Sequence, residues 1–275
     1  MKTKRSIAAV ISMLMAMSGM AQTYEQLVEQ GLKAAQNDSL ELAEKHFREA
    51  MKLSPTDYRN ALLFSNIGTL KERQGKNMEA LDCYTYAVNQ YPQSVPFLRE
   101  RANLYLQLGN YQKALFDYTA ILDADPSDAD AHAYRGYIYS RQREYDKAKL
   151  DFDDALRKES DNYIAQLGLA VIQNKMGHRE EAFSQISQLI DKYPDKSELY
   201  FVRSEFEEEL QRKELAITDL DKAIELNPTN TNYIISRANL HLDLKNKRMA
   251  RLDYEQAIKL GVPRSSLKES LKKCK

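Results

Sequence analysis

The sequence contains no tryptophan, only two cysteines, and few of the residues that form tight turns. Nine glycines and seven prolines among 275 residues argue against an all-β chain, because closely spaced turns use many of both. Cys83 and Cys274 lie too far apart in the sequence to suggest a disulfide framework or a metal-binding motif. The 40 basic and 40 acidic side chains balance, so no overall positive charge indicates a nucleic-acid partner.

Catalytic motifs are missing as well. The sequence has no glycine-rich phosphate loop and no Gly-x-Ser-x-Gly elbow. Its four histidines form no i, i+4 pair of the kind that binds zinc on a helix. We therefore predict a non-enzymatic protein without catalytic residues, bound metal or cofactor. The histidines that we interpret as packing or surface residues are His46, His132, His178 and His241.

Residues 1–21 have the three parts of a secretory signal peptide. Three basic residues within the first five precede an uncharged apolar stretch at 6–20. This stretch is short for a membrane span, which needs about 20 apolar residues. Gly19 and Ala21 place small side chains at −3 and −1 of a cut before Gln22. We predict export to the periplasm or secretion, with an uncleaved N-terminal anchor as the alternative.

A 34-residue period runs through the rest of the chain. Residues 95–128 contain two amphipathic helical patterns, with Gly109 and Asn110 between them and Pro126 after the second. The same arrangement returns in the next 34 residues, and a fixed period with two helices per repeat indicates a repeat protein. We predict seven repeats, with a three-residue insertion after the first: 24–57, 61–94, 95–128, 129–162, 163–196, 197–230 and 231–264.

Three positions, numbered from 1 to 34 within a repeat, keep one kind of side chain throughout. Position 8 is small, position 20 is alanine, and position 24 is large and apolar. Small residues at 8 and 20 allow two helices to approach closely, while positions 20 and 24 share one helical face. In chain order, the residues at positions 8, 20 and 24 are Gly31, Ala43 and Phe47; Gly68, Ala80 and Tyr84; Ala102, Ala114 and Tyr118; Gly136, Ala148 and Phe152; Ala170, Ala182 and Ile186; Ser204, Ala216 and Leu220; Ala238, Ala250 and Tyr254.

This pattern, with proline at position 32 of five repeats, resembles the tetratricopeptide repeat family. The resemblance implies an all-α fold, a right-handed α-solenoid of seven helix-turn-helix repeats over residues 22–264. Repeat five departs from the family at positions 4 and 11, where Gln166 and Gln173 replace bulky side chains. We expect its first helix to pack less tightly than those of the other repeats.

The tail, residues 265–275, lies outside the repeat pattern. Ser266 and Glu269 fit a capping box at the start of a helix. Leu267, Leu271 and Cys274 then fall on one helical face. Because a terminal repeat otherwise leaves its apolar flank in water, we predict that this tail is a capping helix.

Arginine at position 7 and aspartate at position 23 occur together within individual repeats. Four repeats have both residues and the other three have neither. An arginine can meet a carboxylate through two parallel hydrogen bonds, so we predict an interhelical pair inside each of these four repeats. The alternative is that the two residues occur together because these repeats share an ancestral duplication, with no contact between the side chains. The predicted structural pairs are Arg101 with Asp117, Arg135 with Asp151, Arg203 with Asp219, and Arg237 with Asp253.

The family resemblance implies a concave groove lined by the first helix of each repeat. In this chain a polar and basic section is followed by an apolar and then an acidic one, which would suit an extended or helical peptide. Arg99 and Asn103 match part of the carboxylate clamp of chaperone-tail binders, but Tyr134, Ile164 and Gly168 occupy its remaining positions. The candidate peptide-binding residues are Arg99, Asn103, Tyr137, Arg141, Leu167, Val171, Lys175, Phe201, Glu205, Glu208, Glu209 and Asn239.

The predicted function is therefore a scaffold that binds a protein or peptide in the groove. We expect no nucleic-acid partner, and membrane association only through a partner. The alternatives are a structural subunit of an envelope assembly that uses its convex face or ends, and an enzyme whose site combines several repeats.

Overall fold

The computed structural model describes residues 22–274, and the predicted signal peptide lies outside them. Every regular element in this range is a helix, which confirms the predicted all-α fold class. No helix within the described range is long and apolar enough to span a bilayer. The chain divides into two parts, one that ends at Pro126 and one that begins at Ser127.

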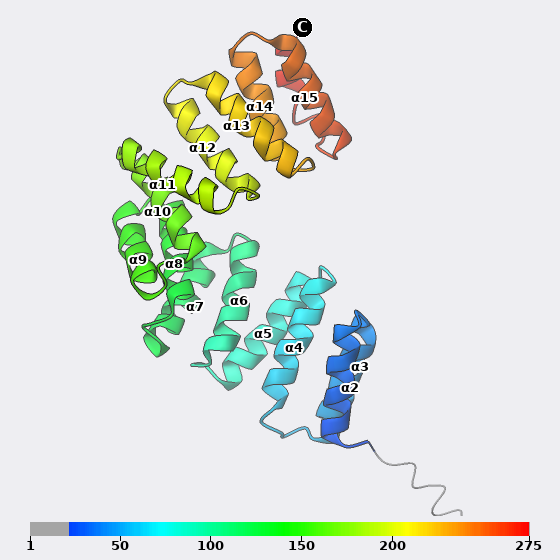
Figure 1. The fold of residues 1–275 in the computed structure, drawn as a ribbon. Helices are drawn as coiled ribbons and strands as arrows, with labels where there is room; N and C mark the ends of the chain where they lie inside the picture. The colour runs from blue at the N-terminus through cyan, green and yellow to red at the C-terminus, as the bar shows by residue number, and fades with distance from the viewer. Residues whose placement is uncertain (1–21, 275) are drawn as a thin grey trace, which may run out of the picture. The chain divides into compact units, whose positions relative to one another are not determined.

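The N-terminal part consists of three consecutive helix pairs, one for each of repeats one to three (Figure 1). Helices of a pair pack against each other, and the second helix of one pair also contacts the first helix of the next. The helices are α2 (Tyr24–Gln36), α3 (Leu40–Leu53), α4 (Asn60–Arg73), α5 (Asn77–Gln90), α6 (Val95–Gln107) and α7 (Tyr111–Ala124).

The C-terminal part holds four helix pairs, for repeats four to seven, and a short final helix. Helix α10 packs on both helices of the preceding pair, α8 and α9. The helices are α8 (Ala129–Arg141), α9 (Tyr145–Lys158), α10 (Tyr163–Lys175), α11 (Arg179–Lys192), α12 (Ser197–Glu209), α13 (Lys213–Leu226), α14 (Thr231–Asp243), α15 (Lys247–Lys259) and α16 (Lys268–Lys273).

Side-chain caps fix where several helices begin. The carboxylate of Asp128 accepts a hydrogen bond from the Ala131 backbone N–H at 2.9 Å at the start of α8. The Asn162 side chain does the same for Ala165 at 3.0 Å at the start of α10. These bonds satisfy backbone donors that have no partner within the first turn of a helix.

The turn inside each repeat depends on one residue in the left-handed region, at position 15. Glycine adopts this conformation without steric cost, whereas another residue loses about 1 kcal/mol. The chain uses glycine in three repeats and a side-chain-bearing residue in four. The φ values are 59° for Asp38, 73° for Gly75, 71° for Gly109, 63° for Arg143, 93° for Gly177, 59° for Gln211 and 61° for Lys245.

The core of each repeat forms where its two helices meet. All seven position-20 alanines are fully buried, and the position-24 side chains are at most 2% exposed. In repeat four, a Cβ atom added to Gly136 would lie 2.9 Å from the ring of Phe152. The aromatic ring thus occupies the space that a larger residue at position 8 would need, as the sequence pattern predicts.

The end of the chain covers the core of repeat seven. Leu267 and Cys274 are 7% and 8% exposed and join the apolar cluster that includes Tyr254. The predicted capping box is wrong in detail, because α16 starts after Leu267 and the Ser266 hydroxyl donates to the Pro263 carbonyl at 2.6 Å. Cys274 is a packing residue because it lies in the apolar cluster with Tyr254, and burial raises the pKa of its thiol.

Candidate functional site

Four arginine–aspartate pairs join the two helices of repeats three, four, six and seven. In each pair, Nε donates to one carboxylate oxygen and Nη2 to the other. The Nε–Oδ2 and Nη2–Oδ1 distances are 2.9 and 2.7 Å for Arg101–Asp117, 2.8 and 2.7 Å for Arg135–Asp151, 2.8 and 2.6 Å for Arg203–Asp219, and 3.0 and 2.7 Å for Arg237–Asp253.

These pairs are structural. The four aspartates are between 1% and 6% exposed, and an ionised carboxylate at that depth needs charge-assisted hydrogen bonds. The bond to Asp219 raises the pKa of Arg203, and the bond to Asp253 does so for Arg237. Arg237 also donates from Nη1 to Asp221 in the preceding repeat at 2.6 Å. These residues hold helices together.

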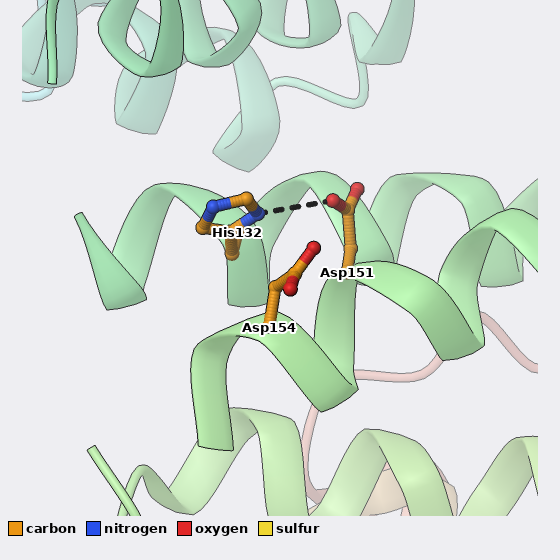
Figure 2. A group of neighbouring side chains, drawn as sticks. All are labelled: His132, Asp151 and Asp154. Carbon is orange, nitrogen blue, oxygen red and sulfur yellow. Dashed lines mark hydrogen bonds and ion pairs between the residues drawn. The ribbon is translucent and has the colours of Figure 1, made fainter. Parts of the chain in front are cut away.

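Repeat four adds a histidine to its pair. His132 Nδ1 lies 3.1 Å from Asp151 Oδ1, and Asp154 approaches from the next turn of α9. Figure 2 shows the imidazole directed at Asp151, with the Asp154 carboxylate beside them. The potential ligand atoms of these three residues lie within 4.8 Å of one another. The sequence predicts a packing or surface role for His132, and its spacing gives no sign of the contact with Asp151.

This cluster is a poor site for a metal cation. Both Asp151 oxygens already accept hydrogen bonds from Arg135, and Asp154 forms an ion pair with Arg157. A cation bound to the two carboxylates would therefore face the guanidinium of Arg135 and would compete with that of Arg157. We interpret the cluster as an extended version of the structural pair.

The predicted binding residues of the C-terminal part lie on the first helices of repeats four to seven, and we call them the first-helix face. Its polar members include Tyr137, which is 37% exposed. Leu167, Val171 and Phe201 are partly buried and pack against the core cluster of this part. The face consists of Tyr137 and Arg141 on α8; Leu167, Val171 and Lys175 on α10; Phe201, Glu205, Glu208 and Glu209 on α12; and Asn239 on α14.

Two members of this face bind each other. Glu209 forms an ion pair with Lys175 and also accepts a hydrogen bond from Asn174 Nδ2 at 2.7 Å. Desolvation raises the pKa of Glu209, but the hydrogen bonds from Lys175 and Asn174 outweigh it and hold the pKa below its ordinary value. Lys175 and Glu209 thus link repeats five and six.

Glu205 differs from its neighbours. Its side chain is exposed to solvent, yet desolvation by the surrounding protein raises the pKa of its carboxyl group. Glu209 and Glu208 raise this pKa further, against the opposing effect of Lys175. Within residues 22–274, no basic side chain forms an ion pair with Glu205. Glu205 is therefore a crowded carboxylate whose charge is only partly offset, by the nearby Lys175.

The N-terminal part contains a polar network that the repeat pattern does not predict. Tyr84 Oη donates to Glu72 at 3.1 Å and lies 3.2 Å from Thr69 Oγ1. Ser65 donates to the carboxylate of Glu100. Desolvation and the charge of Glu72 raise the pKa of Glu100, against the lowering effect of the Ser65 bond. These contacts connect repeats two and three through polar side chains.

The two predicted binding residues of the N-terminal part, Arg99 and Asn103, lie on α6. Asn103 Oδ1 accepts a hydrogen bond from Tyr118 Oη at 2.6 Å, across the helix pair of repeat three. The amide of Asn103 is therefore fixed by a tyrosine from the second helix.

A second paired pattern in the sequence would have revealed these contacts. Tyrosine occupies position 24 in repeats two, three and seven, and these repeats have threonine or asparagine at position 9. The Tyr254 hydroxyl donates to Asn239 Oδ1 at 2.6 Å, as Tyr118 does to Asn103. Both predicted asparagines are thus held in place by the core tyrosine of their own repeat.

Comparisons with known proteins give a consistent result. Four models described as tetratricopeptide repeat match residues 69–135, 135–177, 164–196 and 197–230. A tetratricopeptide repeat protein from Parabacteroides merdae ATCC 43184 is 31% identical to the chain with a TM-score of 0.81, and the match covers 91% of this chain and 98% of that one.

Two further solved structures share the fold at lower identity. PilW, described as a widely conserved type IV pilus biogenesis factor, is 16% identical with a TM-score of 0.62, over 71% of this chain and 91% of its own. A thermophilic TPR protein of Thermus thermophilus is 20% identical with a TM-score of 0.56, over 66% of this chain and 99% of its own. No curated protein sequence matches the chain.

Proposed function

Because the chain belongs to the tetratricopeptide repeat family, we propose that it is a non-enzymatic scaffold that binds a protein or peptide along its first helices. Proteins of this family mediate protein–protein interactions. The first-helix face of the C-terminal part supports this proposal, since it combines partly buried apolar side chains with polar groups.

Glu205 is the observation that carries the proposal. A carboxylate that is desolvated by its surroundings but lacks an ion-pair partner within residues 22–274 gains free energy when a cation arrives. Phe201 and Val171 offer apolar contact on the same face. The partner is therefore expected to bring a lysine or arginine close to an apolar side chain, in an extended or helical segment.

A peptide-binding experiment tests this proposal. The purified chain would be titrated with an array of peptides that pair lysine or arginine with apolar residues. We expect Glu205→Gln to weaken binding about tenfold, since a charge-assisted hydrogen bond contributes about 1.5–3 kcal/mol. Glu214→Gln, an exposed glutamate on α13, is the matched control and should bind like the unchanged protein.

The pH dependence provides a second readout. Binding of a cation requires the ionised form of Glu205, so binding should decline as the pH falls through the raised pKa of this group, above the ordinary glutamate value of 4.5. Glu205→Gln should lose this step. Equal peptide affinities of Glu205→Gln and the unchanged chain at every pH would refute the assignment.

A structural subunit that uses the opposite side of the helix pairs is a second candidate. Leu150 on α9 is 65% exposed and borders an open depression with Leu156, Asp153 and Arg157. An exposed apolar side chain in such a place suits contact with another protein. Crosslinking and mass spectrometry in the native envelope would separate the candidates, because Leu150→Glu should remove partners of this side and leave those of Glu205.

We also propose that the protein acts outside the cytoplasm. The proposal rests on the basic start, short apolar stretch and small residues of 1–21. N-terminal sequencing of the protein from separated cell fractions tests it. A mature chain starting at Gln22 in the periplasmic or secreted fraction is expected, and a cytoplasmic chain that retains Met1 would refute it.

A further inference from the structure

The C-terminal end of the chain is much more basic than the rest. Residues 245–275 contain ten lysines or arginines but only three aspartates or glutamates, although the complete chain has 40 of each sign. The preceding residues therefore carry the acidic excess. Such an asymmetry indicates a region that attracts anions.

Several of these basic side chains line a cavity. A pocket of about 400 Å³ lies between α15 and residues 264–272. This volume falls within the range of about 300–1,000 Å³ that is usual for small-ligand sites. Its polar lining consists of Arg251, Arg264, Lys268, Lys272, Ser265 and Glu255.

Two of the four cations are already engaged. Arg264 donates from both terminal nitrogens to Glu255, each at 2.9 Å, and Lys272 lies 2.7 Å from Glu269. Arg251 and Lys268 are exposed and have no ion-pair partner within residues 22–274. The Arg264 hydrogen bond and the charges of Arg264 and Arg251 hold the pKa of Glu255 below its ordinary value. Two cations of the pocket are thus not held in an ion pair within this range and can meet an added anion.

We propose that this pocket binds a phosphate group, with Arg251 and Lys268 as its main ligands. A phosphate group carries a charge of about −1.5 to −2 and three strong acceptor oxygens, which matches two free cations and the hydroxyl of Ser265. The planar guanidinium of Arg251 can meet two phosphate oxygens at once, and Lys268 supplies a point charge. A single carboxylate would neutralise only one of the two positive charges of Arg251 and Lys268.

The pocket has room for more than the phosphate, so the group belongs to a phosphorylated small molecule or to a lipid headgroup. This site lies on the last helix pair and α16 and does not involve the first-helix face. The two proposals therefore rest on different residues and are tested separately.

Calorimetric titration of the full chain with inorganic pyrophosphate tests the site. We expect saturable binding that weakens with added salt. The double variant R251Q/K268Q should bind at least about tenfold more weakly, because it loses two charge-assisted contacts. The variant K33Q/K52Q removes two exposed lysines of the N-terminal part and should bind like the unchanged chain.

A vesicle arm distinguishes the two sources of the phosphate. Sedimentation with vesicles containing phosphatidic acid, and release by pyrophosphate, would assign a lipid headgroup. Pyrophosphate binding without sedimentation would assign a soluble phosphorylated molecule. Absence of saturable pyrophosphate binding, unchanged affinity in R251Q/K268Q, or equally tight binding of a polyglutamate peptide would overturn the proposal. Circular dichroism and thermal unfolding of the variants would show that each is folded.

Discussion

Repeats five and six have the same helix lengths but join their helices differently. Repeat six uses the bidentate contact of Arg203 with Asp219. Repeat five has Leu169 and Gln185 at the same two positions. In repeat five, a cavity of about 270 Å³ lies beside Gln185, and Gln185 Oε1 is buried without a hydrogen-bond partner within residues 22–274.

The comparison shows which features the fold requires. Both repeats bury the alanine at position 20 and the large residue at position 24 completely or almost so. The polar pair is present in one and missing in the other. Packing of small against large residues therefore defines the helix pair, and the arginine–aspartate contact strengthens a pair that is already formed.

Removing the carboxylate of repeat six should have the largest effect. Asp219→Ala leaves Arg203 without its partner in a largely buried place, which should lower the free energy of unfolding by about 3 kcal/mol. Gln185→Ala, at the same position of repeat five, should change it by less than about 1 kcal/mol. Chemical denaturation, with hydrogen exchange of α12 and α13 to localise the loss, measures both.

A double-mutant cycle on Arg203 and Asp219 provides the control. If the two residues act as one unit, the double variant should lose much less than the sum of the single variants. Additive losses would mean that the pair contributes nothing beyond its separate side chains, and the distinction between the two repeats would disappear.

Repeat five should gain stability when the partly buried Gln185 is replaced. Gln185→Leu removes a side-chain oxygen that lacks a partner within the described residues and adds apolar volume next to a cavity, so the free energy of unfolding should rise by about 1 kcal/mol. Hydrogen exchange of α10 and α11 should slow in parallel. Gln188→Leu, which borders the same cavity but has no buried orphan oxygen, is the matched control. An equal gain from Gln188→Leu would mean that added apolar area alone, and not removal of the unpaired oxygen of Gln185, causes the stabilisation.

The left-handed turn residue also differs, with Gly177 in repeat five and Gln211 in repeat six. Gln211→Gly should relieve the strain of a side chain in the left-handed region and stabilise the protein by about 0.5–1 kcal/mol. The greater conformational entropy of glycine in the unfolded chain offsets part of this gain. Gly177→Ala should destabilise it by a similar amount. Thermal unfolding of the two variants is the measurement, and shifts of the same sign would contradict this account.

The smallest effect is expected at the link between the two repeats. Glu209→Gln removes the ion pair with Lys175, which is partly exposed, and should cost about 0.5 kcal/mol at neutral pH. Because the folded state lowers the pKa of Glu209, this stabilisation is present above the ordinary glutamate pKa and is lost as the pH falls through the lowered value. The difference between variant and unchanged protein should accordingly vanish in acid. A difference that persists there would point to packing instead of charge.

The helix pairs and the arginine–aspartate contacts could be predicted because both depend on positions within a single repeat. Four repeats have Arg at position 7 and Asp at position 23, and three repeats have neither residue. A single sequence therefore allows repeats with the pair to be compared with repeats without it. The looser packing of the first helix of repeat five, expected from Gln166 and Gln173, stays a prediction.

The rest depends on geometry that periodicity does not contain. The approach of His132 to Asp151 requires the rotation of α8 against α9, and the pair of Lys175 with Glu209 requires the offset between neighbouring repeats. The bonds of Tyr118 and Tyr254 were predictable in principle, since tyrosine at 24 accompanies a polar residue at 9 in the same repeat.

Arg237 has a consequence for how such an array can change its length. Its guanidinium binds Asp253 within repeat seven and Asp221 of repeat six at the same time. A gene rearrangement that deletes repeat six would remove Asp221 and leave Arg237 with Asp253 alone. Repeats are often treated as interchangeable modules, but Arg237 binds an aspartate that repeat five, with Ser187 at the same position, does not offer.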